Sequence, residues 1–147
     1  ENLRLRYEKG PYGPYPDNMR HVLNAVEGHF IAGFYDGGEQ PDKVLQVVPG
    51  ADSDANAFLD AHPDTQQRLQ KVGRLVDGFE TSYGLELLST IHWVAAEEGA
   101  NTLDSVIART HNWNARKRKF SRHQIHIALS RLQNQGWLDN FANSSTS

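Results

Sequence analysis

The sequence contains no cysteine, only one methionine, and no apolar run long enough to cross a membrane. The lack of cysteine excludes disulfides, zinc–thiolate sites and cysteine nucleophiles. A membrane-spanning helix needs about 20 consecutive apolar residues, and the first ten residues, ENLRLRYEKG, lack the apolar segment of a signal peptide. We therefore expect a cytoplasmic location and, because the chain does not begin with methionine, a fragment of a longer protein.

Motifs of enzyme active sites are also missing. The chain has no G-x-S-x-G, G-x-x-x-x-G-K or H-E-x-x-H motif, and no G-x-G-x-x-G followed by a helix and an acidic residue. Two pairs at helical spacing, Asp17 with His21 and His123 with His126, each bring two candidate metal ligands to one face without an evident third. We therefore predict no enzymatic activity, no metal and no cofactor.

Charge is distributed unevenly along the 147 residues. Residues 1–83 carry 13 acidic and 8 basic side chains, whereas residues 84–147 carry 5 acidic and 7 basic ones. The strongest acidic bias lies between residues 28 and 64, where the only basic residue is Lys43. A compact basic cluster, Arg116-Lys117-Arg118-Lys119 with Arg122, stands against it. Either cluster can be an ordinary solvated surface or a surface that attracts a charged partner.

The first half predicts short strands and three helices. Leu3, Leu5 and Tyr7 alternate with charged residues, which is typical of a half-buried strand. A helix capped by Asp17 or Asn18 is expected to end at Gly28. After it we expect strands over residues 29–35 and 44–48, and then helices over residues 52–61 and 63–77. Pro63 would lie in the first turn of the last of these helices.

Three helices are predicted from Gly84 onward. In the first, Leu85, Leu88, Ile91, His92 and Ala95 mark the expected apolar face. The second is expected to be capped by Asn101, and the third by the S-x-x-Q capping box that begins at Ser121. Gly136 should end the third helix, with Trp137-Leu138 leading into a short strand or wing.

These segments predict an α+β fold that is mainly helical. A small β-sheet is expected in the N-terminal part, residues 1–83, and a winged-helix-like three-helix part in residues 84–147, ending in a disordered polar tail. The two parts are expected to form one compact domain.

The winged-helix pattern carries a DNA-binding hypothesis. In such domains the third helix enters the major groove and nearby basic residues contact phosphates. The candidate nucleic-acid contacts are Arg116, Arg118, Lys119, Arg122 and His126. The same fold is also used for protein contacts, so the pattern leaves both uses open.

The segment KGPYGPYP, residues 9–16, places three prolines, two glycines and two tyrosines between a strand and a helix. Each proline fixes its own φ and holds the preceding residue extended, so the loop should be stiff. A stiff loop presents side chains at low entropic cost, which favours Tyr12 and Tyr15 as anchors for a partner. The alternative is that both rings pack on the domain's own core. Trp113, next to the basic cluster, has the same two possibilities.

Several strings in this chain resemble the C-terminal region of DarG-type macrodomain antitoxins. The strings are LRLRYEKGPYGPY at residues 3–15, NMRHVLN at 18–24, EGHFI at 27–31, GFETSYGLELL at 78–88 and GWL at 136–138. Together they extend over nearly the whole chain. The combination KGPYGPY followed by N-x-R-H-V-L is the most specific of them, whereas the winged-helix ending is generic.

The resemblance implies a function for this region. In that family the full antitoxin is similar to a fusion of a macrodomain, which removes ADP-ribose from DNA bases, with a C-terminal region like this chain. The C-terminal region is expected to bind and neutralise a DarT-type toxin, a DNA ADP-ribosyltransferase that acts on thymidine in single-stranded DNA, partly by mimicking DNA. The macrodomain and its glycohydrolase activity would then lie outside this chain.

The acidic segment gives DNA mimicry a physical basis. A toxin that binds single-stranded DNA should offer a positive groove with stacking surfaces, so carboxylates can stand in for phosphates and a rigid tyrosine for a base. No motif of the family assigns contact residues, and the contact set is our own hypothesis. It comprises Tyr12, Tyr15, Arg20, His21, Asp36, Glu39, Asp42, Asp52, Asp54 and Trp113. The alternative is a winged-helix module that recruits the macrodomain to DNA or represses its own operon.

Overall fold

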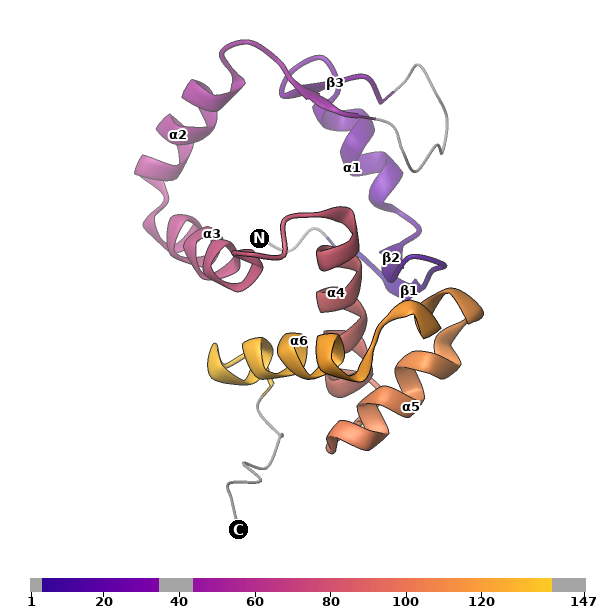
Figure 1. Cartoon of the computed structure of the whole chain (residues 1–147). Coiled ribbons are helices and arrows are strands. Elements are labelled where there is room, and N and C mark those ends of the chain that lie inside the picture. Colours follow the sequence, from indigo (N-terminus) through magenta and orange to yellow (C-terminus); the bar gives the residue numbers. More distant parts are fainter. Residues whose placement is uncertain (1–3, 35–43, 139–147) are drawn as a thin grey trace. The chain divides into compact units, whose positions relative to one another are not determined.

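The computed structural model describes residues 4–34 and 44–138 and confirms a mainly helical α+β fold (Figure 1). Its helices are α1 (Met19–Val26), α2 (Ala51–Ala61), α3 (Pro63–Val76), α4 (Ser82–Ala96), α5 (Leu103–Trp113), the 3-10 helix η2 (Ala115–Lys119) and α6 (Arg122–Asn134). The strands form two two-stranded sheets. In one, β1 (Tyr7–Lys9) pairs with β2 (Pro14–Pro16); in the other, β3 (Ile31–Ala32) pairs with β4 (Gln46–Val47).

The chain forms two compact units. The first comprises Glu1–Glu8 and Tyr15–Lys71, and the second comprises Lys9–Pro14 and Val72–Ser147. The second unit thus takes in a short N-terminal loop together with the C-terminal helices. The predicted division between residues 83 and 84 into an N-terminal and a C-terminal part stays a prediction.

The first unit is held largely by polar contacts to the backbone. Strands β3 and β4 pair antiparallel, with Ile31 opposite Val47 and Ala32 opposite Gln46. Beside this pair, the Glu27 carboxylate accepts hydrogen bonds from the backbone N–H groups of Gly33, at 2.9 Å, and Phe34, at 3.1 Å. These hydrogen bonds join the end of α1 to the residues just after β3.

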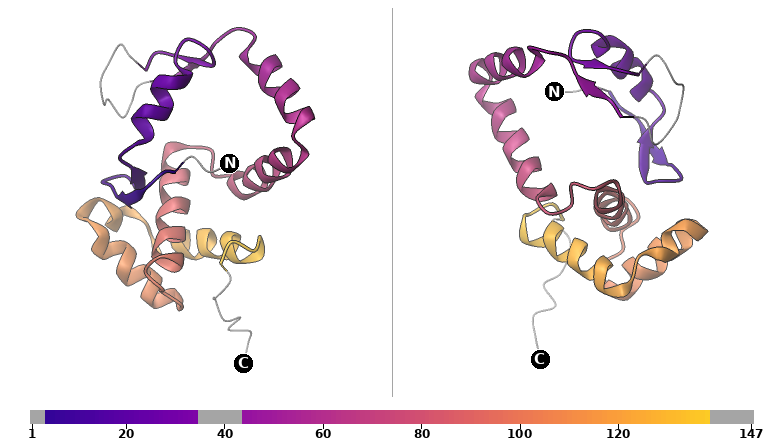
Figure 2. Two further views of the ribbon diagram at one scale, coloured as in Figure 1. Left: turned by 180° about the vertical axis from the view of Figure 1, so that it is seen from behind. Right: turned by 45° about the horizontal axis from the view of Figure 1, so that its top comes forward.

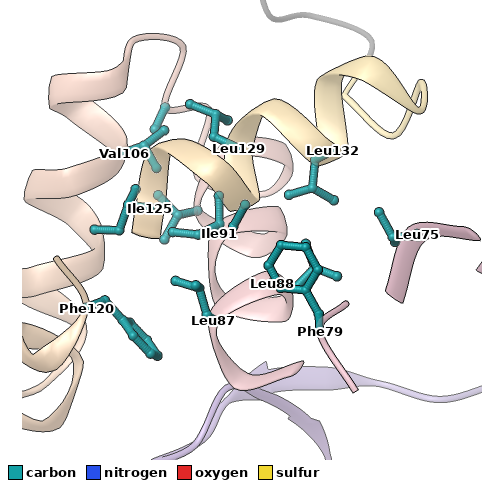
Figure 3. Packing of buried hydrophobic residues seen from close by; sticks show 13 residues of the cluster. Leu75, Phe79, Leu87, Leu88, Ile91, Val106, Phe120, Ile125, Leu129 and Leu132 are labelled. Atoms are coloured by element: carbon teal, nitrogen blue, oxygen red, sulfur yellow. The ribbon is translucent and has the colours of Figure 1, made fainter. Parts of the chain in front are cut away.

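The second unit contains the hydrophobic core. Figure 3 shows Ile125, Leu129 and Leu132 of α6 packed with Ile91 of α4, Val106 of α5 and Leu75 of α3. Ile91, Val106, Ile125 and Leu132 are fully buried. The two views in Figure 2 show the same crossing of α4, α5 and α6, with the tip of the β1–β2 hairpin beside the segment that follows α5. This core is the platform on which the site described below is built.

The buried face of α4 differs from the predicted one. Leu88 and Ile91 are buried as expected, but Leu85 is 42% exposed and Glu86 is 9% exposed. Residues around much of the circumference of α4 are buried, so its buried residues do not lie on a single apolar stripe. The burial of Glu86 instead of Leu85 has a structural cause, given below.

The helix caps were predicted with mixed success. The capping box of Ser121 and Gln124 is confirmed, with both reciprocal hydrogen bonds present. The cap of α5 is Thr102 and not Asn101, because Thr102 forms its own capping box with Ser105. Asn18 does occupy the N-cap of α1, but its side chain does not cap that helix. It bonds instead to the carbonyl of Arg4 and the N–H of Arg6.

The strands are shorter than predicted, and the first is displaced. Alternation pointed to a strand over residues 3–7, whereas β1 covers Tyr7–Lys9 and pairs with β2. The glycine turn between these strands, in which the Gly10 N–H donates to the Gly13 carbonyl at 2.9 Å, decides where pairing occurs. Gly136 lies just past α6 with φ of 67°, as expected. Trp137 and Leu138 form no strand, and the rest of the predicted wing and tail lies outside the described residues.

Arg131 of α6 secures the end of α3. Its guanidinium donates hydrogen bonds to the carbonyls of Arg74, Leu75 and Asp77, at 3.1, 3.2 and 2.8 Å. The last carbonyls of a helix have no partner within the helix. Arg131 therefore supplies the donors that the C-terminus of α3 lacks.

Candidate functional site: the docked tyrosine loop

Residues Lys9–Pro14, here called the tyrosine loop, are anchored to the second unit through their backbone. The Trp113 indole Nε1–H donates to the Gly10 carbonyl at 2.9 Å, and the Asn114 side-chain amide donates to the Pro11 carbonyl at 3.1 Å. Both anchors lie where α5 ends and η2 begins. The loop is thus stiffened by its prolines and also fixed to the helical core.

Gly13 allows the loop to approach α4 closely. Gly13 is buried, and its backbone φ of 148° is one that residues other than glycine rarely adopt. A Cβ at this position would lie 3.1 Å from the Ser89 hydroxyl oxygen. Glycine is therefore required here for backbone conformation and for space.

Tyr12 projects from the loop and stacks against a cation. Its side chain is 47% exposed, and the Arg116 guanidinium carbon lies 4.4 Å from the ring centroid. An arginine over an aromatic face is attracted by the quadrupole of the ring. One face of the ring thus meets Arg116 while about half of the residue stays accessible, and presentation of Tyr12 to a partner stays a prediction.

The basic segment of η2 converges on one buried carboxylate. Lys117 Nζ lies 2.9 Å from Glu86 Oε1, and Lys119 Nζ lies 3.0 Å from Glu86 Oε2. Arg116 Nη2 is 3.7 Å from the same Oε2 atom. The Lys117 side chain is fully buried and that of Glu86 is 7% exposed. Three cations thus share one carboxylate, which explains why Glu86 faces inward.

The pKa values of this cluster follow from burial and pairing. Burial acts to raise the pKa of Glu86, but hydrogen bonds from Lys117 and Lys119 outweigh it and hold that pKa below its usual value. Burial lowers the pKa of Lys117, and the hydrogen bond that Lys117 donates to Glu86 offsets this lowering only in part. The carboxylate is therefore charged at neutral pH, and it is the group that makes burial of the Lys117 ammonium tolerable.

A second ionic group lies at the base of the tyrosine loop. Lys9 forms an ion pair with Glu98, and Arg109 approaches the same carboxylate at 3.8 Å. Lys9 Nζ also lies 4.7 Å from the centroid of the Trp113 ring, while Lys117 Nζ lies 5.5 Å from it. Trp113 therefore joins the two ionic groups as well as anchoring the loop.

The predicted partner contacts fall in different places. Tyr12 and Trp113 come together in the tyrosine loop, where Trp113 is half-buried, and Tyr15 is 52% exposed in β2. Arg20 and His21 are exposed at the start of α1, and Asp52 and Asp54 are exposed in the first turn of α2. Asp36, Glu39 and Asp42 lie outside the described residues. As contacts of a partner, all of these stay predictions.

The predicted nucleic-acid residues are mostly engaged within the protein. Arg116 and Lys119 interact with Glu86, and Arg122 donates to Asp104 at 2.8 Å. Arg118 and His126 are exposed. These internal ion pairs weaken the argument for a winged-helix surface that reads duplex DNA through the basic cluster.

Sequence reasoning missed Glu86, Glu98 and the role of Lys9. A signal for Glu86 was present, because it interrupts the apolar run Leu85-Glu86-Leu87-Leu88 at a position that a helix would bury. A charge in such a run requires a partner. No comparable signal joined Lys9 to Glu98, which are brought together only by the docking of the loop.

Within residues 4–34 and 44–138, no three His, Asp or Glu side chains gather closely enough to hold a metal ion. No helix in that part of the chain has the length and apolar character needed to cross a membrane.

This chain is similar to one part of several longer known proteins. No protein-family model matches the chain. It is 36% identical over 137 residues to the DNA ADP-ribosyl glycohydrolase of Thermus aquaticus. The aligned region covers 93% of this chain but only 38% of that protein. The proteins of the same name from Mycobacterium tuberculosis and Mycobacterium bovis are also 36% identical over 137 residues, covering 89% of this chain and 39% of theirs. The chain thus spans about two fifths of the length of these relatives.

Proposed function

We propose that this chain is the toxin-binding region of a DarG-type antitoxin, and that it neutralises a DarT-type DNA ADP-ribosyltransferase by covering that enzyme's single-stranded DNA site. The observation that carries the proposal is the extent of the sequence match. It includes nearly all of this chain but less than half of proteins named DNA ADP-ribosyl glycohydrolase. A region of this kind, distinct from the macrodomain, is the expected toxin-binding part of the DarG type.

The residues favour binding over catalysis. The most organised polar group among the described residues is the Glu86 cluster, whose carboxylate is 7% exposed and occupied by Lys117 and Lys119. A carboxylate that compensates a buried ammonium is occupied within the protein and is not available to act on a substrate. We therefore assign glycohydrolase activity to the remainder of the full protein.

The acidic segment supports contact with a positively charged groove. Asp52, Asp54, Asp60 and Asp64 are all exposed on α2 and the start of α3. Together with Asp36, Glu39 and Asp42 they form an acidic segment with one basic residue, Lys43, between residues 28 and 64. Carboxylates spaced along such a segment can occupy phosphate positions in a single-stranded DNA site.

Calorimetric titration of the chain into a catalytically inactive DarT-type toxin tests the proposal. We expect a saturable complex whose affinity falls as the salt concentration rises, because the contacts are ionic. In a parallel anisotropy measurement, the chain should release a labelled oligonucleotide from the toxin. A titration of the chain into the oligonucleotide alone sets the contribution of direct DNA binding. Absence of heat and of release would overturn the proposal.

Charge variants locate the toxin-binding surface. Neutralising Asp36, Glu39 and Asp42 together, or Asp52 and Asp54 together, should weaken toxin binding by about tenfold or more. The matched control, Glu97→Gln with Asp104→Asn, removes two exposed acidic groups from the second unit and should leave the affinity nearly unchanged. An equal effect of the control would mean that only net charge matters and that the acidic segment is not the contact.

A further inference from the structure

The tyrosine loop and η2 present an aromatic ring in a strongly positive environment. Within residues 4–34 and 44–138, five cations form ion pairs with two carboxylates, Glu86 and Glu98; the cations are Lys9, Arg109, Arg116, Lys117 and Lys119. Three positive charges in this group therefore have no counter-charge within those ranges. Arg118, exposed in η2 and without an ion-pair partner in the part of the chain that the structure describes, adds a fourth.

Most of this charge is accessible to a partner. The side chains of Lys9, Arg109 and Arg116 are each between 43% and 49% exposed. Tyr12 is exposed to a similar extent, with Arg116 against one face of its ring. Among the described residues no other ring or cation stacks on Tyr12, and about half of this residue is exposed, which leaves ring surface for a planar group.

The anchoring of the loop makes this surface preorganised. The hydrogen bonds from Trp113 and Asn114 fix the backbone just before Tyr12, at the carbonyls of Gly10 and Pro11, and Glu86 pairs with Arg116. The hydrogen bond from the Gly10 N–H to the Gly13 carbonyl closes the turn that carries Tyr12. A ring and a cation that are already in place lose little entropy when a ligand binds. The surface thus combines a free aromatic face with several fixed positive charges.

We propose that this surface, formed by Lys9, Tyr12, Arg116 and Arg118, binds single-stranded nucleic acid. Tyr12 stacks on one unpaired base, and the three cations contact neighbouring phosphates. Stacking platforms next to positive charge are the general means of binding single strands without sequence preference. A duplex presents no base face to Tyr12, and an acidic polypeptide would use the charges but not the free ring face. The inference does not rest on the proposed function, which places the toxin on the acidic segment.

Fluorescence anisotropy with a labelled, mixed-sequence oligonucleotide of about a dozen nucleotides tests the inference. We expect saturable binding at low salt, with log affinity falling against log salt with a slope of about −2, as three phosphate contacts predict. Tyr12→Ala should weaken binding about tenfold, whereas Tyr12→Phe retains the ring and most of the affinity. Arg116→Gln should weaken binding and reduce the salt slope by about 0.7.

Arg74→Gln is the matched control. It also removes one positive charge from the second unit, but Arg74 is an exposed residue of α3 that belongs to neither the tyrosine loop nor η2. Circular dichroism of every variant establishes that it is folded. The inference fails if the oligonucleotide does not bind at low salt, or if Arg74→Gln weakens binding as much as Arg116→Gln. It also fails if poly-glutamate or a duplex of the same sequence binds as tightly as the single strand.

Discussion

At the scale of single residues, Glu86 determines how the second unit tolerates its basic segment. It lies in an apolar run of α4 and yet contacts three cations of η2, one of which is fully buried. Removing one partner of a buried ion pair costs far more than the pair contributes, because the other charge is left without compensation. Among the described residues, the Glu86 carboxylate has three cationic partners, whereas Lys117 pairs with no carboxylate other than Glu86.

This asymmetry gives a first prediction. Glu86→Gln should lower the free energy of unfolding by about 3 kcal/mol, because it leaves the Lys117 ammonium buried without a carboxylate. Lys117→Met should cost only about 1 kcal/mol, since Lys119 and Arg116 still compensate Glu86. Urea unfolding monitored by circular dichroism measures both. A larger loss in Lys117→Met than in Glu86→Gln would contradict this account of the cluster.

His92 provides a second prediction, on pH. Burial lowers the pKa of His92, an effect that nearby Glu97 only partly opposes, and the ring packs edge-on to Trp137 with centroids 6.3 Å apart. The unfolded chain therefore takes up a proton below about pH 6.5 that the folded chain resists. Stability should be complete above that pH and should decline as the pH falls below it.

The measurement is urea unfolding between about pH 8 and about pH 5.5, where Glu86 does not yet contribute. His92→Gln should flatten the dependence, whereas His126→Gln, which removes an exposed histidine, should leave it in place. If both variants keep the slope of the native chain, another group is responsible.

At the scale of elements, α3 depends on α6 for its C-terminus. The three carbonyls bound by Arg131 belong to the last turn of α3 and the residue just after it. Arg131→Gln should destabilise the chain by about 1–2 kcal/mol. It should also accelerate amide hydrogen exchange near residues 75–79 more than elsewhere. Arg122→Gln, which breaks an exposed pair, should change stability by less than about 0.5 kcal/mol. Unchanged exchange at the end of α3 in Arg131→Gln would show that this clamp is dispensable.

The elements also show which parts of the fold the sequence determines locally. The capping box at Ser121 was predictable because all of its donors and acceptors lie within four residues. The cap at Thr102 follows the same rule, but Asn101 beside it is an equally good cap by residue type. Strand β1 was misplaced because its pairing with β2 is set by the Gly10–Gly13 turn and not by alternation of side chains.

At the scale of the whole molecule, the acidic and basic groups differ in how far the sequence alone describes them. The acidic bias between residues 28 and 64 is visible from composition, and its members Asp52, Asp54, Asp60 and Asp64 are exposed on α2 and at the start of α3. The basic cluster could not be understood in that way, because its compensation by Glu86 joins residues about thirty positions apart. Likewise, Tyr12 and Arg116 were singled out separately, and only the docking of the loop brings them together.

We propose that this chain neutralises a DarT-type toxin without a macrodomain. The most direct test is a titration of the chain into active toxin, with ADP-ribosylation of a single-stranded oligonucleotide as the readout. The oligonucleotide is kept at about tenfold excess over the chain, so that binding of DNA by the chain cannot deplete the substrate. We predict that toxin activity falls in proportion to added chain and is lost near equimolar amounts. Full activity at severalfold excess of the chain over the toxin would contradict the account.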